Sequence, residues 1–349
     1  MNEVTDGNSQ ALVRVRDLSV HFPIRRGFGG GKAVVRAVDG VSLEVLAGET
    51  LGLVGESGSG KTTLGRAMLR LVTPTAGTVE FEGRDITRLA ERELRPLRRR
   101  MQPVFQDPHA ALNPAMTIGD AVAHPLLIQK LAPDRDTARA RAAAMLERVG
   151  ITPARAFLDR YPDDLSGGQK QRAVLARALV TEPSLVVADE PVAMLDMSVR
   201  ALVLDLMAEL RREFGLTYVF ITHDLATARL LCDRVAVMYL GRVVEIGPAA
   251  TVLAEPRHPY TQALLEAVPR VDPPSIGRFG AGRTRPVLAG EVPDATDVPG
   301  GCRFHPRCPE AFELCGPDGE DPALEPPAGH GPGSGVAVAC HLCRITSRT

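Results

Sequence analysis

The first part of the chain alternates apolar and polar positions in a pattern typical of half-buried strands. Residues 12–22 (LVRVRDLSVHF) and 38–49 (VDGVSLEVLAGE) carry apolar side chains at about every second position, which predicts strands of an antiparallel sheet with one buried face. The glycine-rich segment GFGGGK at 27–32 lies between them. It is predicted to be a flexible loop.

Three nearly continuous apolar runs follow and predict buried strands of a parallel sheet. TLGLVG at 50–55 passes through a glycine-rich turn into KTTLGRAMLRLV at 61–72, whose apolar residues have helical spacing. SLVVADEP at 184–191 and TYVFITHD at 217–224 end in polar residues, and such strand ends usually form the site of a parallel sheet. Residues 198–215 have a helical period and a glycine stop, so they predict the crossover helix between these strands.

The composition changes near Glu255 and predicts a domain boundary there. Residues 256–349 contain fifteen of the 28 prolines and show little periodicity. We therefore expect a first domain at 1–255 and a second, appended domain at 256–349. The chain has no internal repeat, so it is expected to carry one copy of this strand–helix unit.

The net charge, the first residues and the length of the apolar runs limit the kinds of function and location that we expect. The 41 basic and 42 acidic residues nearly cancel, so no long-range attraction to nucleic acid is expected. The first ten residues are polar and lack the basic start and apolar stretch of a secretory signal. Apolar runs stay below the roughly 18 to 20 residues of a membrane helix, so the chain is expected in the cytosol, with any membrane role depending on a partner.

The first motif with clear chemistry is a phosphate loop. It fits G-x-x-x-x-G-K-[ST] between a predicted strand and a predicted helix, and Thr63 follows it; the residues of the motif are Gly55, Glu56, Ser57, Gly58, Ser59, Gly60, Lys61 and Thr62. Its backbone N–H groups can surround phosphate oxygens, Lys61 can meet the β and γ phosphates, and Thr62 can ligate Mg²⁺. A plain glycine-rich turn before a helix is the alternative interpretation.

Two adjacent acids end the predicted strand LVVAD. Asp189 can hold Mg²⁺ directly or through water, and Glu190 beside it can polarise an attacking water. An apolar strand that ends in acids often just starts a solvated loop. The motif gains its meaning because it follows a phosphate loop in the same chain.

A second helix N-terminus with residues suited to bind an anion indicates the family. Ser166, Gly167, Gly168 and Gln169 precede a helix with basic residues on one side. At this point the sequence resembles the ATP-binding subunits of ABC transporters, and three more residues match that family in the expected order: Gln106 in VFQDP, Asp196 after the paired acids and His223 after TYVFIT.

The resemblance implies the fold class and the architecture. The expected fold is α/β, a P-loop NTPase of the ABC type with a parallel sheet core, an antiparallel β subdomain and a helical subdomain at about 107–165. A small irregular extension that contains cysteines follows. The helical subdomain would dock on a membrane protein, although it could also simply cover the sheet.

The resemblance also assigns roles to single residues. Phe22 would stack on adenine, with a core strand position as the alternative. Gln106 would sense Mg²⁺ and the γ phosphate, and His223 would hold the γ phosphate and position water. The implied Mg²⁺ ligands are Thr62, Gln106 and Asp189. The serine–glycine loop, together with Asp196, would complete the ATP site of the second ATPase subunit rather than its own.

One loop departs from the family pattern. Residues 191–196 read PVAMLD, with alanine and methionine where the family commonly has serine and alanine. The hydroxyl that often crosses the dimer interface is therefore missing. This implies unequal ATP sites and favours a paralogous second ATPase subunit over an identical one, while Glu190 still implies hydrolysis.

The end of the chain resembles the extension of oligopeptide and dipeptide importer ATPases, a branch that includes nickel importers. The matching stretches are EPRHPYTQALL from Glu255 and GCRFHPRCP from Gly301. The resemblance implies transmembrane permease subunits as partners on the cytoplasmic side of the cell membrane, an extracytoplasmic peptide-binding protein that acts indirectly, and no nucleic acid. ATP and Mg²⁺ are the implied cofactors.

Five of the six cysteines lie after residue 300, which favours a local metal site over a disulfide framework. In the resembling branch a four-cysteine set is an iron–sulfur site, and the positions that match it are Cys302, Cys308, Cys315 and Cys340. A [4Fe–4S] cluster, tetrahedral zinc and unliganded thiols all remain open. Cys343 is left over, and Cys232, expected inside a helix, is interpreted as core packing.

Two rival functions follow from the same residues. A non-transport ABC ATPase that remodels nucleic acid or ribosomes usually has two ATP units or a basic surface, and this sequence has neither. A metal-cluster sensor regulated by ATP would lose its main activity on removal of the tail, whereas an importer subunit is expected to keep ATP binding.

Overall fold

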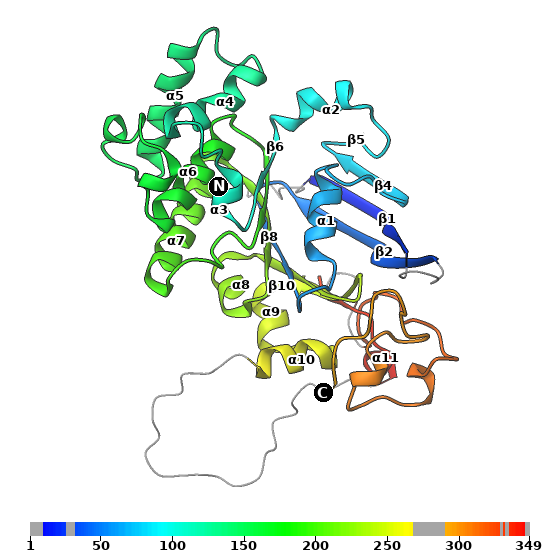
Figure 1. Ribbon diagram of the computed structural model, residues 1–349. Helices are drawn as coiled ribbons and strands as arrows, with labels where there is room; N and C mark the ends of the chain where they lie inside the picture. Colours follow the sequence, from blue (N-terminus) through cyan, green and yellow to red (C-terminus); the bar gives the residue numbers. More distant parts are fainter. Residues whose placement is uncertain (1–9, 26–31, 268–289, 329–330, 332–334, 346–349) are drawn as a thin grey trace, which may run out of the picture. The chain divides into compact units, whose positions relative to one another are not determined.

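The computed structural model describes residues 10–25, 32–267, 290–328, 331 and 335–345 (Figure 1). They form two compact units. The first contains the chain up to Leu18, Ser42–Leu51 and Leu64–Ile221, and the second contains Ser19–Val41, Gly52–Thr63 and the chain from Thr222 onward. The boundary expected at 255/256 divides the sequence differently and stays a prediction.

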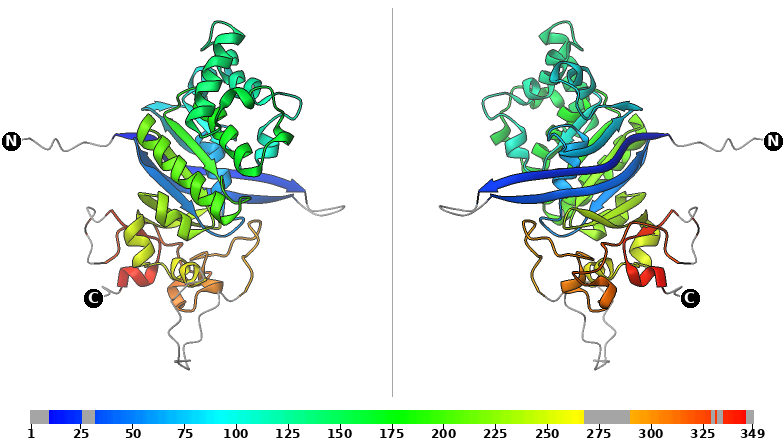
Figure 2. Two further views of the ribbon diagram at one scale, coloured as in Figure 1. Left: turned by 90° about the vertical axis from the view of Figure 1, so that its left-hand side faces the viewer. Right: turned by 90° about the vertical axis from the view of Figure 1, so that its right-hand side faces the viewer.

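Two long strands confirm the alternating pattern near the start of the chain. They are β1 (Ala11–Arg25) and β2 (Lys32–Leu46), which pair with each other; β4 (Ala76–Phe81) and β5 (Arg84–Asp85) complete the sheet in the order β2-β1-β4-β5 (Figure 2). In β2 the side chains of Leu43 and Val45 are buried, while those of Ser42 and Glu44 are exposed. Of the predicted loop at 27–32, all but Lys32 lies outside the described residues.

The parallel strands of the first unit are also as predicted. β6 (Met101–Val104), β7 (Leu185–Asp189) and β8 (Thr217–Thr222) pair in parallel, and β8 lies next to β3 (Thr50–Val54). Their apolar side chains are almost fully buried, as expected for strands covered on both faces. The crossover from β7 to β8 is α7 (Met197–Phe214).

Helix α7 ends where the glycine stop predicts. Gly215 has a φ of 62°, in the left-handed region that glycine adopts without steric cost. The chain then returns directly into β8.

Most helices of the first unit lie between β6 and β7. Helix α2 precedes β6, and α4, α5 and α6 pack against one another, while α3 packs against α6; the bounds are α2 Glu91–Arg98, α3 Pro108–Ala111, α4 Ile118–Ile128, α5 Arg135–Arg148 and α6 Gly167–Leu179, with 3₁₀ turns η1 Ala154–Ala156 and η2 Pro162–Asp164. The segment at about 107–165 thus contains α3, α4, α5 and two 3₁₀ turns, and its role as a separate helical subdomain stays a prediction.

In the second unit the sheet order is β11-β10-β9-β3, and β10 pairs antiparallel with both β9 and β11. The chain after 255 is more regular than expected, because it adds a strand and several short helical turns. The elements are α8 Leu225–Leu231, β9 Arg234–Tyr239, β10 Arg242–Pro248, α9 Ala249–Ala254, α10 Pro259–Glu266, η3 His305–Arg307, η4 Glu313–Cys315, β11 Ala337–Val338 and α11 His341–Ile345. Helix α1 (Lys61–Met68) starts in this unit and continues in the first.

One expectation about a cysteine is wrong in part. Helix α8 ends at Leu231, and Cys232 follows it in an extended conformation rather than lying inside the helix. The interpretation as core packing is confirmed, since Cys232 is 9% exposed. A Cβ added to Gly52 would lie 2.8 Å from its sulfur, so β3 and this cysteine pack too closely for a larger residue than glycine.

No helix among the described residues is long and apolar enough to cross a bilayer. The longest, α7, has 18 residues and carries several charged side chains.

The side chain of Glu245 links β10 to the residues just before α10. It lies fully buried on β10 and accepts N–H bonds from Arg257 at 2.8 Å and His258 at 3.1 Å. Burial raises the pKa of its carboxyl, against the hydrogen bonds that lower it. Folding therefore favours the protonated form, and the stability that this form contributes is lost as pH rises above the unfolded value.

We predict that Glu245→Gln changes the pH dependence of stability. Relative to the unsubstituted chain, the variant should gain free energy of unfolding as pH rises from about 4.5 through the raised pKa, by at most about 1.4 kcal/mol per pH unit. Urea denaturation at a series of pH values measures this difference. A difference that is the same at every pH would show that Glu245 does not titrate in that window.

Candidate functional site

The phosphate loop joins β3 to α1. It begins directly after Val54, and α1 begins at Lys61. Three of its residues have positive φ angles, of 147°, 79° and 102°: Gly55, Gly58 and Gly60. Such angles are easily reached only without a Cβ, so the glycines of the motif are required by the backbone.

Two of these glycines are also pressed against neighbouring main chain. A Cβ on Gly60 would lie 2.1 Å from the carbonyl oxygen of Ala37, and one on Gly55 would lie 2.3 Å from that of Met238. Neither backbone oxygen can move like the end of a flexible side chain. The backbone of the loop between β3 and α1 is therefore closely packed in one conformation.

Lys61 is held inside this loop. Its side chain is almost buried, and its ammonium donates to the carbonyl oxygens of Gly55 and Glu56, both at 2.8 Å, and to Ser59 Oγ at 3.3 Å. The positive charge thus lies at the centre of the loop, where a phosphate group would meet it.

The other expected nucleotide contacts in the second unit are more open. Ser57 and Gly58 are exposed at the tip of the loop, and Thr62 and Thr63 are half-buried in the first turn of α1. His223 is exposed. Phe22 on β1 is 39% exposed, which fits a ring available for stacking better than a core position.

In the first unit the fold brings together two predicted residues that are far apart in sequence. Gln106 Nε2 donates to Glu190 Oε2 at 3.0 Å. Glu190 follows Asp189 at the end of β7 and has a φ of 47°. A non-glycine residue in this region is uncommon and marks a backbone held by its surroundings. Asp189 and Glu190 are both half-buried.

The serine–glycine loop starts helix α6 through a capping box. Ser166 Oγ accepts from the Gln169 N–H at 3.3 Å, and Gln169 Oε1 accepts from the Ser166 N–H at 3.0 Å. A Cβ on Gly168 would lie 2.6 Å from Val199. Ser166, Gly167 and Asp196 are exposed, so the helix start is ordered and still accessible.

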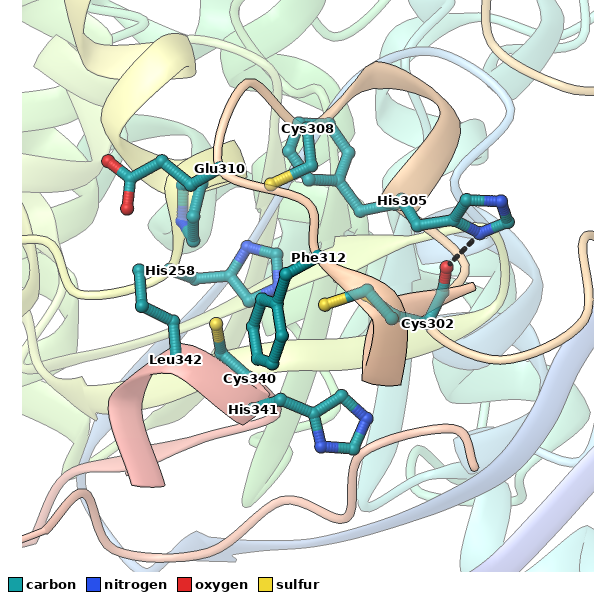
Figure 3. A pocket seen from close by; sticks show the side chains of 12 residues that line it. His258, Cys302, His305, Cys308, Glu310, Phe312, Cys340, His341 and Leu342 are labelled. Atoms are coloured by element: carbon teal, nitrogen blue, oxygen red, sulfur yellow. Dashed lines mark hydrogen bonds between the residues drawn. The ribbon is translucent and has the colours of Figure 1, made fainter. Parts of the chain in front are cut away.

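The C-terminal extension contains a pocket lined by four cysteines. Cys302 and Cys308 come from one short stretch and Cys340 from a later one, and Figure 3 shows their thiols turned toward the same space. Other lining residues are aromatic or titratable; the full lining is His258, Pro259, Cys302, Phe304, His305, Cys308, Glu310, Phe312, Cys315, Cys340, His341 and Leu342. The four cysteines matched to an iron–sulfur set are thus brought together.

The thiols in this pocket differ in acidity. Burial raises the pKa of Cys302 to about 12 and that of Cys308 to about 11. A hydrogen bond from the Cys343 thiol lowers the pKa of Cys340 to about 6. Cys343, left over in the sequence analysis, therefore acts on a pocket cysteine without lining the pocket.

The pocket has suitable ligand atoms for a metal group, but its described side chains are not arranged around one metal ion. Thiolates are suitable ligands for zinc and for iron–sulfur clusters. Among the described residues, however, no three His, Cys, Asp or Glu side chains are arranged to hold one metal ion. The expected iron–sulfur or zinc site is therefore a proposal and not an observed feature.

Two residues near the phosphate loop were not singled out by the sequence analysis. Tyr260 Oη accepts from the Glu56 N–H at 2.9 Å, and Arg307 binds the Glu56 carboxylate. Both lie in the two stretches that carry the importer resemblance. Their position in those stretches was the available signal, because nothing in the local pattern connects them to a residue 204 and 251 positions earlier.

The phosphate loop, the acids that end a parallel strand and the second serine–glycine helix start define an ATP-hydrolysing P-loop protein of the ABC type. Residues 38–193 match the ABC transporter family, and residues 244–315 match the C-terminal region of oligopeptide/dipeptide transporters. Together with its relatives, these matches show that the chain belongs to the ATP-binding subunits of ABC peptide importers. It is an ATPase subunit that powers peptide import.

Its relatives are similar over most of their length. A probable peptide ABC transporter ATP-binding protein of Sinorhizobium fredii is 47% identical over 335 residues, covering 96% of this chain and 90% of that protein. The oligopeptide transport ATP-binding protein AppF of Bacillus subtilis is 46% identical and covers 89% of this chain and 93% of that protein. These matches give no support to a non-transport ATPase or a sensor.

Solved structures match the ATPase part. The ATP-binding cassette MJ0796, in a dimeric post-hydrolysis state bound to ADP and Pi, is 30% identical with a TM-score of 0.61, covering 68% of this chain and 98% of that one. The cbiO1 protein of Clostridium perfringens is 29% identical with a TM-score of 0.60, covering 70% and 91%. The fold class expected from the sequence is confirmed.

Two glycines of the loop give a matched pair for testing its packing. Gly60→Ala places a methyl group 2.1 Å from a backbone oxygen, whereas Gly58→Ala has nothing within 4 Å and meets only the cost of a positive φ, roughly 1 kcal/mol. We expect Gly60→Ala to reduce ATP binding at least tenfold and Gly58→Ala to reduce it much less. Binding of a fluorescent ATP analogue measures both, and equal losses would contradict the packing argument.

Proposed function

We propose that ATP is hydrolysed with Glu190 as the residue that polarises the attacking water. The observation that carries this proposal is the hydrogen bond of 3.0 Å between the Gln106 amide and the Glu190 carboxylate. It orients the Glu190 carboxylate, a group that can accept a proton from water as a general base. Gln106 would report the state of the γ phosphate, and His223 would hold it and help to position the water.

The phosphate loop, from Gly55 to Thr63, would bind the triphosphate through its N–H groups, while Lys61 exchanges its carbonyl partners for phosphate oxygens. Phe22 would stack on the adenine ring. Thr62, Gln106 and Asp189 offer only oxygen donors in these roles, the ligand type that Mg²⁺ prefers. When bound, Mg²⁺ neutralises charge on the transferring phosphate.

The second half of each ATP site would come from another ATPase subunit. The exposed, capped start of α6 supports this, because backbone N–H groups at a helix start suit an anion, and Ser166 and Gly167 are exposed. Its contacts would be made by Ser166, Gly167, Gly168, Gln169 and Asp196. The dimeric state of the similar cassette bound to ADP and Pi is the model for such pairing. Met194, 63% exposed in the loop before Asp196, favours a paralogous partner with unequal sites.

We place this subunit on the cytoplasmic face of the cell membrane. There it would bind transmembrane permease subunits through the helical segment at about 107–165 and would work with an extracytoplasmic peptide-binding protein only indirectly. The names of its relatives refer to peptides and oligopeptides, so short peptides are the proposed cargo. No nucleic acid is expected to bind.

The catalytic assignment predicts a specific kinetic defect. Glu190→Gln should lower ATP turnover by about 10² to 10⁴-fold, the usual contribution of a general base, while ATP binding persists. Glu182→Gln is a matched control, since Glu182 lies in the same unit and pairs with Arg141 on the surface. Phosphate release by the assembled transporter measures the effect. Full turnover by the Glu190 variant would overturn the assignment.

We further propose that the cysteine pocket holds a [4Fe–4S] cluster rather than zinc. Four thiolates of a cluster bind four different irons and need not converge on one point, whereas ligands of one zinc ion all lie about 2.3 Å from it. The absence of a single-ion arrangement among the described side chains is compatible with the larger group. Binding would release protons from Cys302 and Cys308, whose thiols are protonated near neutral pH.

Anaerobic purification tests the cluster. The full chain should show broad visible absorbance near 400 nm on the order of one cluster per chain, and Cys302→Ser should abolish it. Cys232→Ser is the control, because Cys232 follows α8, outside the extension, and does not line the pocket. Zinc in elemental analysis would show a zinc site, and colourless protein with four reactive thiols would show unliganded cysteines. Either result would contradict the cluster.

A further inference from the structure

Glu56, the second residue of the phosphate loop, is bonded through all three of its polar groups. Its N–H donates to Tyr260 Oη at 2.9 Å, and its carbonyl oxygen accepts from Lys61 at 2.8 Å. Its carboxylate accepts from both terminal nitrogens of Arg307, at 2.8 and 3.1 Å. Two of the three partners lie after residue 255, and one of these, Arg307, is in the cysteine-containing part of the extension.

Arg307 is well placed to act as a fixed partner. Its side chain is 5% exposed and that of Glu56 is 27% exposed, so the pair is partly shielded from water and weakly screened. The arrangement is bidentate, which adds directional specificity to the attraction. The hydrogen bond to Glu56 is also the main cause of the raised pKa of Arg307.

An aromatic cluster holds both partners of Glu56 in place. The rings of Tyr239, Tyr260 and Phe304 have centroids 4.7 to 5.4 Å apart. The guanidinium of Arg307 lies over the Tyr239 ring at 5.8 Å. Since all three rings are almost fully buried, a movement of Arg307 away from the loop would have to disturb this packing.

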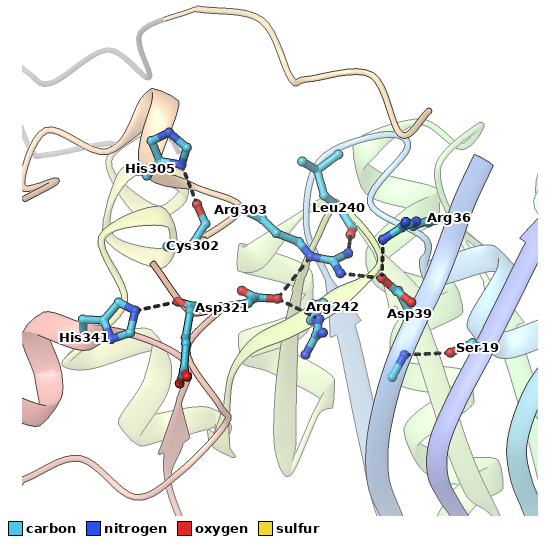
Figure 4. Close-up of polar contacts among 12 residues, drawn as sticks. Ser19, Arg36, Asp39, Leu240, Arg242, Cys302, Arg303, His305, Asp321 and His341 are labelled. Carbon is cyan, nitrogen blue, oxygen red and sulfur yellow. Dashed lines mark hydrogen bonds and ion pairs between the residues drawn. The ribbon is translucent and has the colours of Figure 1, made fainter. Parts of the chain in front are cut away.

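A second arginine anchors the same stretch of the extension. Arg303 donates to the carbonyl oxygen of Leu240 at 2.7 Å, to the carboxylate of Asp39 and to that of Asp321 at 3.3 Å (Figure 4). Leu240 follows β9 and Asp39 lies on β2. The turn that carries Arg307 is therefore attached to the sheet strands of its unit independently of Glu56.

The charge of Glu56 explains why this contact bears on ATP. A carboxylate in a phosphate loop repels the triphosphate, and a paired arginine cancels most of that repulsion at short range. The carbonyl of the same residue holds Lys61, so the orientation of Glu56 also affects the lysine that meets the phosphates.

We propose that Arg307 is a positioning residue for ATP binding, which acts by neutralising and orienting Glu56 of the phosphate loop. The C-terminal extension is then part of the ATP-binding machinery and not a separate appendage. It follows that removal of the tail weakens ATP binding even in an importer subunit, contrary to the expectation from the sequence.

The test compares ATP affinity in full-length variants. Arg307→Ala should weaken binding of a fluorescent ATP analogue about tenfold or more, and in the assembled transporter KM for ATP should rise more than kcat falls. Arg307→Lys should restore part of the affinity. Glu56→Gln combined with Arg307→Ala should restore most of it, because the unpaired carboxylate is gone. Arg344→Ala, in the same extension and paired with Glu325 on the surface, is the matched control and should bind normally.

Thermal melting separates this role from a role in folding alone. If Arg307→Ala does not fold, ATP affinity is measured instead for Arg307→Gln, which keeps a polar side chain at this position. Normal ATP affinity without the arginine overturns the proposal. So does a double variant that binds no better than the single one, since the defect would then arise from lost packing and not from an unpaired charge.

Discussion

The ATP site depends on the close packing of the phosphate loop against main chain of its own unit. Gly60 and Gly55 approach the carbonyl oxygens of Ala37 and Met238 so closely that no side chain fits. Ser59 accepts a hydrogen bond of 2.9 Å from the Gly241 N–H. These contacts decide where the N–H groups of the loop point, and preorganised dipoles of this kind are what a transferring phosphate group requires.

The extension adds an electrostatic constraint to this packing. It carries Arg307 to the Glu56 carboxylate inside the loop. The same stretch is attached by Arg303 to Asp39 on β2 and to Leu240 after β9. The cysteine pocket lies in the same extension, with Cys302 and Cys308 directly adjacent in sequence to Arg303 and Arg307. The residues that would hold a metal group and the residues that hold the phosphate loop are therefore neighbours on one short segment.

Much of the fold could be predicted because the governing interactions are local. The strand periods, the helix after Lys61 and the stop at Gly215 follow from side-chain spacing and from backbone angles that one residue controls. The candidate nucleotide residues were found for the same reason, since a phosphate loop is a continuous motif. Cys232 was wrongly expected inside a helix, because a buried apolar residue fits both a helix and an extended connection.

The sequence by itself determined the class of protein, its strands and helices, and the identity of the phosphate-binding and acidic residues. Only the tertiary structure decided that Gln106 is bonded to Glu190, that Ser166 and Gln169 cap each other, and that Arg307 pairs with Glu56. The reason is physical. A motif is encoded by neighbours along the chain, whereas an ion pair between residues 251 positions apart exists only after every intervening element has packed.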